Sequence, residues 1–143
     1  MSGPFELLEV AGSGLGAERV RMSVITQNIA NANVTSTPEG GPFRRRIVQF
    51  QTILQESRRW ANGGVPAGGV RVSGIRTDHA TPLRKVRDPS HPHADADGWV
   101  SMPNVDLAME MVDLMNASKS YEANLASIRV YREMMQQTMQ ITR

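Results

Sequence analysis

The sequence predicts an α+β chain in which two long terminal helices form an antiparallel coiled coil, with a small, loop-rich β insertion between them. Apolar side chains recur at alternating steps of three and four near both ends of the chain, which is the spacing of a coiled-coil seam. The middle of the chain changes to a period of two and is rich in Gly and Pro. The expected organisation is a helical core of residues 1–33 and 104–143, an extended linker at 34–42 and a β-rich insertion at 43–103.

The C-terminal helix has the stronger of the two seams. Eight of its ten seam positions are apolar and no Gly or Pro lies between them, so the backbone can remain helical throughout. A second apolar stripe, from Val105 to Met134, lies beside the seam. Two stripes predict a helix that other copies, or other proteins, cover on much of its circumference. The seam positions are Leu107, Met111, Leu114, Ser118, Tyr121, Leu125, Ile128, Arg132, Met135 and Met139.

The start of this helix is polar. Asn104 is a reasonable N-cap, and Asp106, Glu110 and Asp113 lie on one side of the first turns. We expect these three carboxylates to complement the positive end of the helix dipole. A catalytic pair of carboxylates would need a cleft, and no Ser and His are paired at a recognisable nucleophile turn.

The N-terminal helix, residues 3–33, has a weaker seam. Three glycines at positions 12, 14 and 16 interrupt it, and each costs about 1 kcal/mol in a helix interior. We expect either a break there or a helix that forms only when it is packed. The same glycines resemble a dinucleotide-binding loop, but no buried strand precedes them. The seam positions are Leu8, Leu15, Met22 and Ile29, with Ala11, Ile25 and Ala32 in the companion row.

The middle of the chain predicts short strands. Alternation from Phe43 to Phe50 indicates one strand, and the apolar residues of 70–75 suggest another. Segments 83–86 and 99–102 are shorter candidates. Such strands have few large apolar residues and are marginal alone. The simplest closure folds the two helices back on each other, with the insertion at one end and both termini at the other.

Composition narrows the function. The chain has 143 residues and no cysteine, which excludes a thiol nucleophile, a disulfide framework and a thiolate metal site. No segment has the roughly 20 apolar residues of a membrane span, and the acidic N-terminus does not resemble a cleaved signal peptide. We therefore expect no direct membrane span, and either a soluble protein or export without a cleaved leader.

The charge is unevenly distributed. The net charge is +2, but residues 40–87 contain ten basic and two acidic side chains. Aromatic side chains are not interleaved with these arginines as base stacking requires, so we expect no nucleic-acid partner. Arginine favours planar contacts with carboxylates at protein interfaces. We expect Arg44, Arg45 and Arg46 to make polar contacts between subunits.

The richest polar cluster is DPSHPHADADG, residues 88–98. Its histidines and aspartates could bind a metal, which makes a metal-binding module the alternative function. As a calcium loop it fails at both ends, because His93 and Asn104 stand where the first acid and the bidentate Glu are needed. It also lacks the spacing of a zinc site. The competing interpretation is a turn made rigid by Pro, in which Asp side chains cap the backbone.

Three runs of sequence resemble one family. The run SGLGAERVRMSVITQNIANANVTSTPEGGPFRRR from Ser13 is similar to the N-terminal signature of bacterial flagellar rod and hook proteins. The runs DPSHPHADADGWVSMPNVD and EMVDLMNASKSYEANLASIRVYREM resemble the same family. Phe43 and Trp99 stand where Tyr is common, and the turns after Val130 match less well.

The resemblance implies a structural subunit, with neither catalytic activity nor a cofactor. Family members are exported through the flagellar type III apparatus and stack helically into the periplasmic rod, a torque-transmitting shaft around the export channel. The implied partners are other copies, the other proximal and distal rod proteins, and the export-gate adaptor protein. We expect subunit packing through Leu8, Leu15, Met22, Ile25, Ile29, Leu107, Met111, Leu114, Tyr121, Leu125, Ile128 and Met135.

Overall fold

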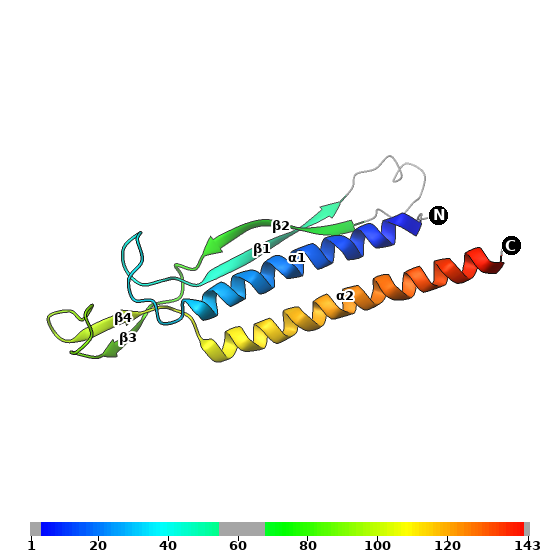
Figure 1. Ribbon diagram of the computed structural model, residues 1–143. Helices are drawn as coiled ribbons and strands as arrows, with labels where there is room; N and C mark the ends of the chain where they lie inside the picture. The colour runs from blue at the N-terminus through cyan, green and yellow to red at the C-terminus, as the bar shows by residue number, and fades with distance from the viewer. Residues whose placement is uncertain (1–3, 55–67, 142–143) are drawn as a thin grey trace.

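The computed structural model describes residues 4–54 and 68–141, and it contains two helices and two short hairpins (Figure 1). Helices α1 and α2 lie side by side and antiparallel, so that the start of α1 and the end of α2 meet at one end of the molecule. This arrangement confirms the predicted α+β class. The elements in chain order are α1 (Pro4–Ala30), β1 (Arg46–Leu54), β2 (Gly68–Thr77), β3 (Arg84–Arg87), β4 (Trp99–Met102) and α2 (Leu107–Ile141).

Helix α1 is the central layer. It packs against α2 on one side and against the β1–β2 hairpin on the other (Figure 1). The β3–β4 hairpin projects beyond the opposite end of the helix pair from the termini. We call the end near β3–β4 the base and the end near the termini the tip.

Helix α2 is long because nothing in its sequence stops it. Its 35 residues contain no Gly or Pro, and at 1.5 Å per residue it extends about 52 Å. Asp106 is its N-cap, because an oxygen of that carboxylate accepts the backbone N–H groups of Ala108 at 2.9 Å and Met109 at 3.2 Å. The prediction that Asn104 caps this helix is therefore wrong.

Asn104 instead braces the loops at the base. It is buried, and its side-chain oxygen accepts the backbone N–H of Arg45 at 2.8 Å. Its amide group donates to the carbonyls of Asp78 at 3.1 Å and Thr81 at 3.2 Å. An Asn offers both donors and an acceptor, so one side chain joins three segments that are distant in sequence.

Helix α1 runs through its three glycines without a break. Packing on both flanks explains this continuity. A Cβ at Gly14 would lie 3.0 Å from the Asn124 amide, so α2 approaches the backbone closely there. On the other flank, the Ser13 hydroxyl accepts the backbone N–H of Val70 at 3.1 Å. The predicted break is therefore absent, and the alternative, a helix that forms only when it is packed, stays a prediction.

The strands form two separate antiparallel pairs. β1 pairs with β2 from Arg46↔Thr77 to Leu54↔Gly68, with an irregularity between Gln49 and Phe50. β3 pairs with β4 over four residues each. The predicted strand from Phe43 starts three residues too early. Phe43 instead packs in a small core with Ala32 and Val105.

The buried apolar core is small relative to the apolar surface. Among the described residues its members are Ala17, Val24, Ile25, Ala32, Phe43, Val100, Val105 and Ala117. Four of the eight are Ala, Val or Ile from α1 or the turn that follows it, and none of the large apolar side chains of α2 is included. Helices and hairpins thus supply the backbone hydrogen bonds, while much of the surface of α2 stays uncovered.

Substituting the α1 glycines with alanine should change stability differently at open positions and at the position that α2 approaches closely. A Cβ at Gly12 or Gly16 meets no atom within 4 Å, so Gly12→Ala and Gly16→Ala should each stabilise the isolated chain by about 0.5–1 kcal/mol. Gly14→Ala should gain less or destabilise, because its methyl group meets Asn124. Urea unfolding followed by circular dichroism measures all three. Equal gains at the three positions would contradict the close approach of α2.

Candidate functional site: packing faces and polar base of the helix pair

The face of α2 that contacts α1 is rotated from the predicted seam. Its most buried positions recur every seven residues, but they are polar or small: Glu110 and Ala117, followed by Asn124. Asn124 approaches Gly14, and Glu110 accepts a hydrogen bond from Asn28. Within this chain, the most buried positions of α2 are therefore small or polar.

The predicted packing residues divide between the two helices. On α1, Ile25 is buried and the other four are half-buried: Leu8, Leu15, Met22 and Ile29. On α2, three are half-buried: Leu114, Tyr121 and Ile128. The remaining four stay exposed, by 36–50%: Leu107, Met111, Leu125 and Met135. The single chain uses the first group itself and leaves the second free for contacts with other molecules.

Exposed apolar side chains continue along α2 beyond the predicted set. Each of these side chains is more than a third exposed, and six of the ten on α2 are methionines. Exposed apolar side chains in such number are typical of an interaction surface. The full set on α2 is Leu107, Met109, Met111, Val112, Met115, Leu125, Val130, Met134, Met135 and Met139.

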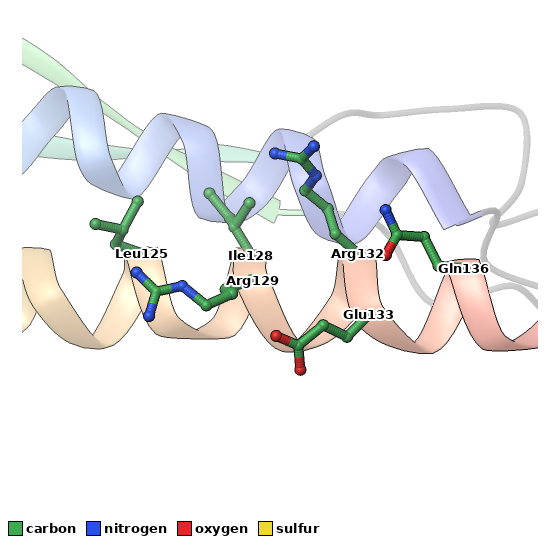
Figure 2. A pocket seen from close by; sticks show the side chains of 6 residues that line it. All are labelled: Leu125, Ile128, Arg129, Arg132, Glu133 and Gln136. Atoms are coloured by element: carbon green, nitrogen blue, oxygen red, sulfur yellow. The ribbon is translucent and has the colours of Figure 1, made fainter.

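Two grooves flank α2 near the tip. One has a volume of about 410 Å³ and is mostly apolar; its walls are Leu8, Ala11, Ala126, Ser127, Ile128, Val130, Tyr131 and Met134. The other, of about 350 Å³, is shown in Figure 2. There Leu125, Ile128 and Arg132 extend from α2 toward the side on which α1 lies. Its other walls are Arg129, Glu133 and Gln136.

A polar cluster around the buried Glu110 joins α1, the segment before β1 and α2 at the base. We call it the base junction and define it as Asn28, Arg45, Glu110 and Asp113. Glu110 is only 1% exposed; it accepts hydrogen bonds from the Asn28 amide at 3.0 Å and from Nε of Arg45. A second guanidinium nitrogen of Arg45 lies 3.1 Å from Asp113. The buried carboxylate therefore has a charged partner and a neutral donor.

Asn28 also fixes the start of β1. Its side-chain oxygen accepts the backbone N–H of Arg46, and its amide donates to the Arg46 carbonyl, both at 2.9 Å. These two bonds are those that a neighbouring strand would otherwise make. One asparagine therefore attaches the hairpin to α1 while it also contacts Glu110 on α2.

The three consecutive arginines have different surroundings. Arg45 points inward to the base junction, so its charge is used within the chain. Arg46 is exposed and lies 5.7 Å from the Phe43 ring, and Arg44 is half-buried. Contacts between subunits remain a prediction for these residues, and Arg45 has little charge left to contribute to them.

The segment 88–98 is a capped turn. Asp88 accepts the Ser90 backbone N–H at 3.1 Å, and Asp95 accepts those of Asp97 and Trp99. Gly98 has φ of +79°, which favours glycine. Asp88 and Asp95 cap the backbone, as the competing interpretation predicted. Residues 4–54 and 68–141 contain no group of three or more His, Asp or Glu side chains placed to hold a metal ion.

Sequence reasoning missed the base junction. Asn28 was not singled out, and Glu110 was assigned only to the helix dipole, although it is the largest fully buried side chain in the part of the chain that the structure describes. The available signal was Asn28 itself. It lies between Ile25 and Ala32 on a row of buried residues, where a polar side chain needs a partner.

Comparison with known proteins assigns the class. The chain matches two family models, Flagella basal body rod protein over residues 8–36 and Flagellar basal body rod FlgEFG protein C-terminal over residues 96–141. These ranges coincide with most of α1 and α2. The class is therefore that of flagellar rod proteins built on paired terminal helices. No helix within the described ranges is long and apolar enough to cross a membrane.

Full-length relatives identify the family. The chain is 38% identical to "Flagellar basal-body rod protein FlgC" of Borreliella burgdorferi, with 97% of each chain covered. It is 39% identical to the protein of that name from Salmonella typhimurium over 93% of each chain, and 36% identical to that of Bacillus subtilis over 96% and 97%. The chain belongs to the FlgC family and is a structural subunit of the rod of the flagellar basal body.

Removal of the buried carboxylate should be costly. Glu110→Ala leaves Arg45 partly buried without its principal partner, so it should destabilise the chain by about 3–5 kcal/mol. Asp113→Ala removes a partner that is 33% exposed and should cost below about 1 kcal/mol. Glu122→Ala, at an exposed site on the same helix, is the control. Urea unfolding measures the free energy of unfolding of the three variants. Similar losses of stability for Glu110→Ala and Asp113→Ala would contradict the central role of Glu110 in the base junction.

Acid should weaken the turn after β2. Hydrogen bonds from the Thr81 hydroxyl and backbone N–H hold the pKa of Asp78 below its ordinary value of 3.8. A lowered pKa stabilises the fold above that ordinary value, and the contribution is lost as pH falls through the folded-state pKa. Between about pH 5 and pH 3, the urea midpoint of the parent should fall more than that of Asp78→Asn. Parallel acid profiles would contradict this.

Proposed function

We propose that the chain polymerises helically through its terminal helices and thereby contributes to a torque-transmitting shaft around the export channel. The observation that carries this proposal is the exposed apolar surface of α2, which the chain does not cover itself. Burial of one such Leu or Met side chain stabilises an assembly by roughly 1.5–3 kcal/mol. Contacts repeated along α2 offset the entropy of ordering each added subunit.

The two ends of the chain contribute differently to this role. The helical core of 1–33 and 104–143 supplies the packing surface, and the insertion of 43–103 is anchored to it at the base junction. The linker of 34–42 connects them. In this division, the exposed members of the predicted set, such as Leu107 and Leu125, contact neighbours. The half-buried members set the shape of the helix pair.

The proposed partners are those of a rod subunit. They are other copies, the other proximal and distal rod proteins and the export-gate adaptor protein, which share the need to cover apolar helix faces. We place the assembled protein in the periplasm, after export without a cleaved signal peptide. The polar clusters of the described segments are used in capping and ion pairs, so the protein acts as a structural subunit without catalysis.

A charge on the exposed face of α2 should block assembly without unfolding the chain. Leu125 is 42% exposed and borders the groove in Figure 2, so Leu125→Asp should leave the helix pair folded and should abolish rod formation. Export is expected to persist, because the substitution lies outside the base junction. Motility in soft agar, secretion of the variant and imaging of basal bodies measure these outcomes.

Gln137→Asp is the matched control, since it adds the same charge at an exposed polar position of α2. We expect it to support motility. Normal rods assembled from the Leu125→Asp variant would reject α2 as the packing surface. Loss of secretion together with loss of helical circular dichroism would mean that Leu125 is needed for folding, and would equally reject the proposal.

A further inference from the structure

We propose that the ion pair of Arg45 and Glu110, together with Asn28, fixes the register of α1 against α2. Register here means which turn of one helix lies beside which turn of the other. The inference concerns the single chain and does not depend on the proposed assembly. It gives the buried charge a role that the packing of apolar side chains cannot fill.

The two facing rows repeat every seven residues, which makes the interface tolerant of sliding. On α1 the row contains Gly14, Arg21 and Asn28; on α2 it contains Glu110, Ala117, Asn124 and Tyr131. Asn28 faces Glu110 and Gly14 faces Asn124, so both contacts belong to one antiparallel register. A shift of seven residues, about 10 Å along the axis, would bring the same two rows together again, with Gly14 opposite Ala117 in one direction and opposite Tyr131 in the other.

The base junction breaks this repetition. Asn28 holds Arg46 by two backbone hydrogen bonds, so a slide of α1 that keeps these bonds draws the neighbouring Arg45 with it and breaks the bond from the Arg45 backbone N–H to Asn104. A slide would therefore separate Glu110 from both Arg45 and Asn28. One slide would bring Glu110 opposite Arg21 and restore a charged partner, but it would leave Arg45 without that carboxylate. Only the observed register satisfies these buried groups together.

Register also shapes the surface at the tip. The apolar groove is built from Leu8 and Ala11 on α1 and from residues between Ala126 and Met134 on α2. A slide of seven residues, about two helical turns, would move the α1 wall of this groove away from its α2 wall. A charge pair at the base therefore determines the shape of the groove at the tip, because α2 is an uninterrupted rod.

Disulfide trapping tests this proposal, since the chain contains no cysteine. Gly14→Cys is combined with Asn124→Cys to report the observed register. It is combined with Ala117→Cys or Tyr131→Cys to report the two slid registers. Each pair is placed in the parent and in an Arg45→Met/Glu110→Leu background, at low protein concentration so that crosslinks form within one chain. Gel mobility without reductant gives the crosslinked fraction.

In the parent we expect only the 14/124 pair to crosslink. In the apolar background, the yield of the 14/117 or 14/131 pair should rise roughly tenfold, since paired apolar substitutions keep the helices but remove the discrimination. Arg129→Met/Glu133→Leu makes the same chemical changes at exposed positions of α2 and should leave the pattern unchanged.

Two results would overturn the proposal. In one, the apolar background retains its helical circular dichroism and still crosslinks only through 14/124. In the other, that background loses its helices, which would make the ion pair a requirement for folding rather than a selector between registers. A rise of the 14/117 or 14/131 pair in the Arg129→Met/Glu133→Leu control would also count against it.

Discussion

The structure depends on how one carboxylate, that of Glu110, is accommodated. Moving a charge out of water costs free energy, and this cost is offset only when charged partners are close and the hydrogen bonds of the group are complete. Arg45 supplies the charge, Asn28 supplies a neutral donor, and Asn104 holds the backbone of Arg45 in place. These four residues come from α1, from the segments before β1 and α2, and from α2 itself. The fold of the base follows from satisfying them at once.

Apolar packing contributes comparatively little to holding the rest of the chain together. The buried apolar side chains are few and mostly small, and ten large apolar side chains of α2 are exposed. A chain of this kind gains stability from whatever binds its folded form, because binding partners shift the equilibrium toward that form. Membership in a family of rod subunits explains why such an exposed apolar surface is retained.

The sequence allowed the two helices, their antiparallel pairing and most of the strands to be predicted, because each has its own local pattern. It did not reveal which face of α2 meets α1. An apolar heptad does not distinguish residues that pack within the chain from residues that stay exposed. Leu114 is half-buried and Leu125 is exposed, although both belong to the same heptad pattern. The base junction was missed for a related reason: Arg45, Asn28 and Glu110 are distant in sequence, and only the folded chain brings them together.

The division of chemistry between the two faces of α2 has a physical rationale. If α1 and α2 met through the same kind of apolar surface that α2 leaves exposed, the inner and outer faces of α2 would be interchangeable. Helices from different subunits could then pair in place of helices from one chain. Glu110, and the small or polar Ala117 and Asn124 that recur with it on the inner face, disfavour that exchange, because an apolar neighbour would leave the buried carboxylate unpaired. The outer methionines can meanwhile adapt to several partners without competing for the inner face.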